Sequence, residues 1–95
     1  MINKLKIAGY AYSVKKHELR GATGECSFRL HEILIKENMA EEETQSTILH
    51  EGLEAIDYHY GLKLRHDTIV LLETALFQFI KANKSFIKAI LGEKT

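Results

Sequence analysis

Apolar and polar side chains alternate along the first third of the chain, which is the spacing of β-strands that bury one face. Lys4 to Ile7 and Tyr10 to Lys15 both show this alternation, and Ala8-Gly9 between them suits a tight turn. These residues therefore predict a short hairpin at the N-terminus.

A second pair of short strands is expected after a loop at Gly21 to Gly24. Cys26 to Leu30 and Ile33 to Lys36 have strand-like composition, and the polar pair His31-Glu32 joins them. We expect a small, mostly antiparallel sheet of about four short strands.

Helical spacing replaces strand spacing in the rest of the chain. A first helix is predicted from about Ala40 to about Tyr58, because Glu41 to Glu43 would then lie in its first turn, where the helix dipole favours acids. Gly61 is well placed as the left-handed residue that ends this helix. Strands followed by helices indicate an α+β fold.

On a helical wheel, the first helix has an apolar stripe and a polar flank. The stripe is expected to consist of Leu49, Gly52, Leu53 and Ile56. His50, Glu54 and Asp57 fall together along one edge of this stripe. We therefore expect a polar cluster at the edge of the core.

A second helix is predicted from about Asp67, a good N-cap, to about Asn83. Its apolar face is expected to comprise Ile69, Leu72, Leu76, Phe79 and Ile80. Glu73 lies within this face, and an unpaired buried carboxylate is costly, so Glu73 needs a cation, a proton or a metal ion. In a purely structural role, Lys63, Arg65 or an exposed water network would pair with it.

The last segment, Lys84 to Thr95, predicts a short third helix that Ser85 caps and Gly92 stops. Its apolar strip would consist of Phe86, Ile87, Ile90 and Leu91. In a chain this small we expect the strip to dock on the chain's own sheet, with pairing to another subunit in a weak homodimer as the alternative.

Composition narrows the class of protein. Ninety-five residues with 45% hydrophobic content fit one globular domain, residues 1–95. Thirteen basic and thirteen acidic side chains cancel, so the chain lacks the positive charge expected of a nucleic-acid-binding protein. With no apolar run that spans a bilayer and no signal-peptide pattern, we expect a cytoplasmic protein with no membrane partner.

The segment His50-Glu51-Gly52-Leu53-Glu54 carries the strongest chemical signal. It reads as the zinc-hydrolase helix motif HExxH with the last histidine replaced by Glu54. Residues four apart lie side by side on a helix, and a carboxylate is an acceptable zinc ligand, so His50 and Glu54 can still hold one ion. A metal ion shared with Glu73 would satisfy all three side chains.

The carboxylate at position 54 changes the chemistry of such a site. A His/Glu/Glu shell neutralises the ion, whereas His/His/Glu leaves it positive, so Glu54 should weaken the pull on a bound water. It also widens the choice of metal from zinc to manganese or ferrous iron.

Other reactive side chains are weaker candidates. The remaining histidines are His17, His31, His59 and His66. His66 is the most reachable substitute ligand, since it just precedes the helix that bears Glu73, whereas His59 should point away from His50. We interpret the single cysteine, Cys26, as a small, half-buried strand residue rather than a nucleophile.

At these positions the chain resembles the small zincin-like metallopeptidase proteins of phages and prophages. The resemblance covers nearly the whole chain and includes the opening strands and Gly24-Glu25. It continues in Thr47-Ile48-Leu49-His50-Glu51, Glu54-Ala55-Ile56-Asp57, Tyr60-Gly61-Leu62 and Leu72-Glu73-Thr74-Ala75-Leu76. Such relatives usually carry HExxHAID in the first helix and a third-ligand glutamate in the second, a pattern that Glu54 breaks.

The resemblance implies a zincin-like domain with Zn²⁺, or alternatively Mn²⁺ or Fe²⁺, held by His50, Glu54 and Glu73. Glu51 would take a proton from the attacking water and later protonate the leaving nitrogen of a peptide.

The same resemblance suggests supporting roles for three further residues. Asp57 would orient His50, unless it is a solvated helix acid. Tyr58 or Tyr60 would stabilise an oxyanion, unless these rings close the last helical turn against the core.

Three functions stay open. The first is a metal-dependent peptidase acting on a protein or peptide. The second is a catalytically degenerate scaffold that binds or inhibits a host protein in the host cytoplasm; Glu54 and the short chain, which leaves few residues to wall a substrate cleft, favour it. The third is a structural domain without metal. The balanced charge speaks against a nucleic-acid partner.

Overall fold

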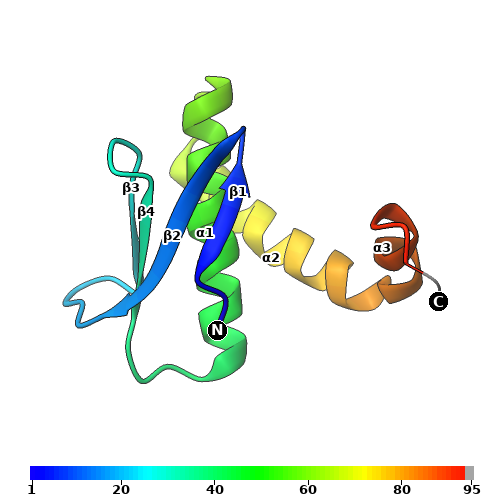
Figure 1. Cartoon of the computed structure of the whole chain (residues 1–95), viewed down its shortest axis with the longest axis horizontal. Helices are drawn as coiled ribbons and strands as arrows, with labels where there is room; N and C mark the ends of the chain where they lie inside the picture. Colours follow the sequence, from blue (N-terminus) through cyan, green and yellow to red (C-terminus); the bar gives the residue numbers. More distant parts are fainter. Residues whose placement is uncertain (94–95) are drawn as a thin grey trace.

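The chain folds as an α+β domain, as predicted, in a computed structural model that describes residues 1–93; Lys94 and Thr95 of the predicted C-terminal segment lie outside this range. The described residues form the strands β1 (Lys4–Ile7), β2 (Tyr10–His17), β3 (Gly24–Ser27) and β4 (Glu32–Lys36). The helices α1 (Glu41–Tyr60), α2 (His66–Ala82) and α3 (Lys84–Ile90) follow (Figure 1). None of the described helices is long and apolar enough to cross a lipid bilayer.

The four strands form one mixed sheet in the order β1-β2-β4-β3. The pairs β1/β2 and β3/β4 are antiparallel, as expected, whereas β2 and β4 pair in parallel. The chain leaves β2, forms β3 at the far edge, and returns as β4 between them. Because local alternation says nothing about strand order, the central parallel pair was not predicted. The consequence for the site is that β3 is an edge strand.

Residues with left-handed backbone angles form the turn of the first hairpin and end α1. Ala8 and Gly9 have φ angles of 51° and 85°, as in the type I′ turns that suit the twist of a two-residue hairpin. Gly61 follows α1 with φ 62° and ψ 37°, which confirms its predicted role as the left-handed cap.

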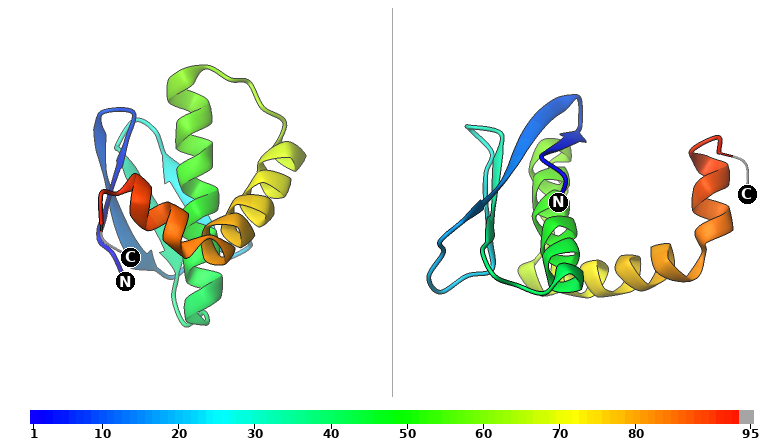
Figure 2. Two further views of the ribbon diagram at one scale, coloured as in Figure 1. Left: turned by 90° about the vertical axis from the view of Figure 1, so that its right-hand side faces the viewer. Right: turned by 60° about the horizontal axis from the view of Figure 1, so that its bottom comes forward.

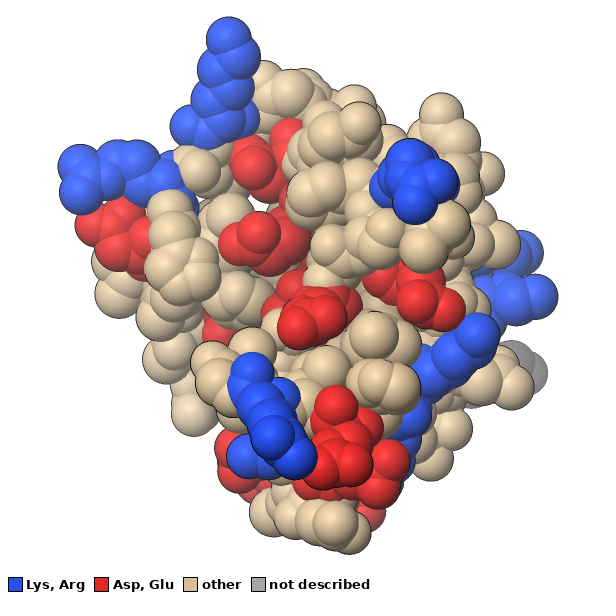
Figure 3. All heavy atoms as spheres, turned by 90° about the vertical axis from the view of Figure 1, so that its left-hand side faces the viewer, with Lys and Arg blue, Asp and Glu red and all other residues tan. Residues whose placement is uncertain are grey.

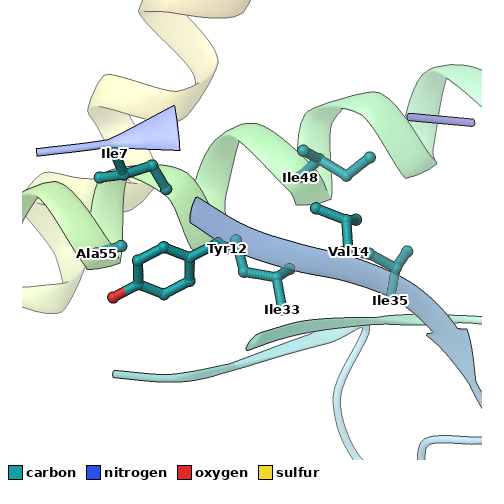
Figure 4. Close-up of a cluster of buried hydrophobic side chains, with 7 residues drawn as sticks. All are labelled: Ile7, Tyr12, Val14, Ile33, Ile35, Ile48 and Ala55. Carbon is teal, nitrogen blue, oxygen red and sulfur yellow. The ribbon is translucent and has the colours of Figure 1, made fainter. Parts of the chain in front are cut away.

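One face of the sheet packs against α1 and forms the core (Figure 4). Side chains from β1, β2 and β4 meet α1 there; the cluster consists of Ile7, Tyr12, Val14, Ile33, Ile35, Ile48 and Ala55. Burial of each large apolar side chain contributes about 1.5–3 kcal/mol, so this packing sets the rotation of α1 about its axis.

The buried face of α1 differs from the predicted stripe. It consists of Thr44, Thr47, Ile48, Glu51, Gly52 and Ala55. Of the predicted stripe only Gly52 is buried, while Leu49 and Leu53 are half-buried and Ile56 is exposed. The prediction followed the largest apolar side chains, whereas the face that α1 turns to the sheet also carries threonine, glutamate, glycine and alanine.

The second helix also differs from its prediction. Arg65, not Asp67, is the N-cap of α2, and no side chain caps it. Of the expected apolar face, Ile69 is buried and Leu72 and Leu76 are half-buried, while Phe79 and Ile80 are exposed. Much of the apolar surface of α2 therefore lacks a cover within the described residues.

The third helix does not dock on the sheet, contrary to expectation. Its N-cap is Asn83 rather than Ser85, and among the described elements it contacts α2 alone. Figure 1 and the right view of Figure 2 show the end of α2 and all of α3 projecting from the sheet and α1. We call residues 75–93 the C-terminal arm.

Candidate metal centre

α1 and α2 meet along a polar seam. Side chains four residues apart on α1 face α2 in turn: Glu42, Ser46, His50 and Glu54. Glu42 pairs with Lys81, Ser46 and His50 contact Glu73, and Glu54 lies opposite His66. Since residues i and i+4 share one helix face, the seam confirms the predicted side-by-side placement of His50 and Glu54.

The His50 imidazole lies between two carboxylates. Its Nδ1 is 2.9 Å from Oε1 of Glu73, and its Nε2 is 3.8 Å from Oε1 of Glu54. The side chain is mostly buried. Glu54 and Glu73 therefore approach different ring nitrogens of the same histidine.

Glu73 finds two partners on α1. Its Oε2 accepts a hydrogen bond from the Ser46 hydroxyl at 2.6 Å, while Oε1 contacts His50. The structural pairing with Lys63 or Arg65 is not formed among the described residues, where Arg65 pairs with Asp67 at 3.0 Å. Metal binding by Glu73 stays a prediction.

Ser46 is a site residue that sequence reasoning missed. Ser46 stands four residues before His50 and therefore lies on the same helix face. This spacing could have identified it from the sequence.

Glu54 and His66 complete a group of three candidate ligands with His50. Nδ1 of His66 is 3.8 Å from Oε1 of Glu54, and one ligand atom from each of the three residues lies within 4.8 Å of the others. Ligand atoms in a tetrahedral zinc site, with bonds of about 2.0–2.1 Å, are about 3.3 Å apart. The His66 side chain is 76% exposed, and its ring packs edge-on against that of His50 with centroids 5.6 Å apart. The three donor atoms would have to move closer together to hold one divalent ion.

Glu51 lies on the sheet-facing side of α1, beneath the edge strand β3. Its side chain is only 7% exposed, and a Cβ placed on Gly24 would be 2.9 Å from its Oε2. Glycine at position 24 therefore permits the close approach. Burial raises the pKa of Glu51; His50 opposes this shift, and the carboxylate of Glu54 adds to it.

Most of these side chains line one pocket of about 570 Å³, although Glu54 does not. His50, Glu51, His66 and Glu73 line it, and the loop from Gly21 to Gly24 closes the other side. Figure 3 views the molecule from the side of β3 and β4 and shows acidic side chains across the middle of this face, with Lys and Arg side chains scattered around them. Such a surface attracts cations rather than anionic ligands.

Cys26 lies in β3 and is half-buried, which confirms its predicted setting. Burial, followed by the carboxylates of Glu51 and Glu54, raises its pKa to about 12. The thiol therefore stays protonated at neutral pH, as a structural cysteine does.

The residues expected in supporting roles lie elsewhere. Asp57 accepts a hydrogen bond from the backbone N–H of Leu64 at 2.8 Å, so it holds the loop between α1 and α2 rather than orienting His50. Tyr58 and Tyr60 are exposed, and the ring of Tyr58 stacks on Phe28. Neither tyrosine lines the pocket.

The other histidines also lie apart from the centre. The ring of His59 hydrogen-bonds to the Tyr12 hydroxyl and stacks on Tyr10, so it points away from His50, as predicted. His31 lies beside the same group, and His17 is the exposed last residue of β2.

Comparison of the chain with protein-family models, with curated proteins and with solved structures returned no match. The resemblance to zincin-like proteins therefore stays a prediction.

Proposed function

We propose that this protein binds one divalent transition-metal ion through His50, Glu54 and His66 and hydrolyses peptide bonds with Glu51 as general base. The observation that supports the ion is the division of the His50 ring nitrogens. Nδ1 lies at hydrogen-bond distance from Glu73 and would donate its proton there, while Nε2 is 3.8 Å from Glu54, beyond hydrogen-bond distance, and would be left to bind an ion. Metal-ligating histidines are typically held in this way.

His66 offsets the loss of the second histidine of HExxH. With Glu73 acting as the partner that orients His50, the ligands become two imidazoles and one carboxylate. This set leaves a divalent ion with net positive charge, unlike the His/Glu/Glu set expected from the sequence. The sequence change at Glu54 therefore does not abolish activation of water.

The chain's own groups supply the proton transfers. A bound ion supplies Lewis acidity toward water and a carbonyl group. Glu51 accepts the proton that the attacking water loses and donates it to the leaving nitrogen, so its protonation state is restored. Its raised pKa, caused first by burial, brings the carboxyl nearer to neutral pH, where both transfers are favourable.

The edge of β3 offers a place for an extended peptide. Within the described residues β3 pairs with β4 alone, so its other edge has free main-chain groups. A strand added there would run beside the pocket that Glu51 and His50 line.

A second candidate function is a metal-binding scaffold that contacts a host protein without hydrolysing it. The burial of Glu51 favours this alternative, because a base that is 7% exposed has little access to substrate.

Glu51→Gln separates the two functions. With zinc supplied, wild type and variant should each bind one ion, while cleavage of a mixed quenched-peptide library is lost in the variant. Glu37→Gln, which removes an exposed carboxylate just after β4, should retain both properties. Equal binding with no cleavage by wild type would support the scaffold, and absence of binding would contradict the metal site.

A further inference from the structure

α2 is apolar around most of its circumference, although α1 covers only one side. From Thr68 to Ile80 the only charged residue is Glu73, which faces α1. The opposite side carries an exposed stripe with helical spacing: Leu71, Ala75, Phe79 and Ala82. Leu71 is 71% exposed and Phe79 is 47% exposed. Helices that are hydrophobic all round are normally buried.

α3 extends this apolar surface. Phe86, Ile90 and Leu91 are all exposed, and the Phe86 ring packs edge-on against Phe79 with centroids 6.2 Å apart. Because α3 contacts only α2 among the described elements, α3 has no cover from the sheet or from α1 (Figure 2).

The exposed area matches what an interface needs. The accessible surface is 6851 Å², whereas a compact monomer of 10.9 kDa is expected to expose about 5,600 Å². The excess of roughly 1,250 Å² exceeds the ~800 Å² that each partner buries in a stable interface of standard size.

We propose that a second copy of this chain covers the arm, with α2 crossing α2 at a twofold axis beside Ala75. Leu71 and Phe79 each stand four residues from Ala75, so an antiparallel crossing there places Leu71 of one copy opposite Phe79 of the other. The small alanine lets the helices approach, and ridges of residues four apart interlock.

Two properties select a second copy over an unrelated partner. The stripe is complementary to itself about Ala75, and the formal net charge of zero gives two copies no overall electrostatic repulsion. The interface lies on the side of α2 opposite Glu73, so dimerisation and metal binding are separable.

The oligomeric state tests the proposal. We expect multi-angle light scattering to give twice 10.9 kDa for wild type at micromolar concentration. Ala75→Glu should weaken association about a hundred-fold by burying two like charges. Thr74→Glu adds the same charge at the neighbouring exposed position, off the stripe, and should stay dimeric. A wild-type monomer, or a dimer that survives Ala75→Glu, would overturn the proposal.

Disulfide trapping gives a second readout that does not depend on weakening the dimer. In a Cys26→Ser background, Ala75→Cys should form a crosslinked dimer under mild oxidation, because the two Ala75 positions face each other at the axis. Thr74→Cys should not. Failure of Ala75→Cys to crosslink in a protein of dimeric mass would also overturn the proposal.

Discussion

Replacing Gly24 by alanine should loosen the packing of the edge strand over the helix that carries Glu51. The added Cβ would lie 2.7 Å from Cγ2 of Thr47 and 2.9 Å from Oε2 of Glu51. Carbon atoms rest at about 3.5–4.0 Å, so at least one group must move. Both neighbours are buried, with 8% and 7% of their surface exposed, which limits where they can go.

The size of the effect follows from two opposing contributions. Overpacking of a tight contact costs about 1–3 kcal/mol. Alanine is better than glycine in a strand by about 0.5–1 kcal/mol, which offsets part of this cost. The middle of the two ranges leaves a net loss of about 1 kcal/mol in the free energy of unfolding, and each 1 kcal/mol lowers Tm by roughly 4–8 °C in a domain of this size.

Gly52→Ala is the matched control. A Cβ at Gly52 would meet only Cδ1 of Leu5, at the ordinary contact distance of 3.9 Å. Because glycine within a helix is about 1 kcal/mol less favourable than alanine, this variant should be more stable than wild type. Thr47→Ser removes the nearest methyl group and should restore part of the stability that Gly24→Ala loses, because the contact with Glu51 remains.

Urea unfolding followed by circular dichroism, with chelator present, measures these differences without a contribution from metal. The reasoning is refuted if Gly24→Ala is as stable as wild type, or if Thr47→Ser fails to rescue it.

Three further predictions concern single side chains. With its pKa raised to about 12, the Cys26 thiol has about three orders of magnitude less thiolate at pH 8 than free cysteine. A disulfide reagent should therefore label Cys26 slowly until urea unfolds the chain. A labelling rate near that of glutathione would contradict this prediction. Glu73→Ala should lower zinc affinity about 10–100-fold in calorimetric titrations by freeing the His50 ring, and unchanged affinity would remove its orienting role. Tyr12→Phe removes the hydrogen bond to His59 and should lower the free energy of unfolding in urea by about 1 kcal/mol. Stability would stay unchanged only if a water molecule took the place of the hydroxyl.

Local periodicity predicted the elements well because it depends on near neighbours. The bounds of β1 match the prediction, Gly61 ends α1, and the four-residue spacing placed His50 beside Glu54. Each of these features is decided within a few residues of sequence.

Features that depend on distant contacts were not predictable in the same way. The face that α1 buries is decided by its packing on the sheet, and the position of β4 depends on how the chain crosses between strands. The partner of Glu73 depends on the pairing of two helices, which brings Ser46 and His50 to it. The location of Glu73 in an apolar stripe of the sequence indicated only that its carboxylate needed some partner.

The metal content of the purified chain tests the central claim most directly. Protein made without a polyhistidine tag, supplied with zinc, manganese and iron and then desalted, should retain close to one ion per chain by elemental analysis. His50→Ala and His66→Ala should each lose it, while His17→Ala, an exposed histidine far along β2, should not. No bound ion in wild type, or equal retention in His50→Ala, would contradict the metal centre.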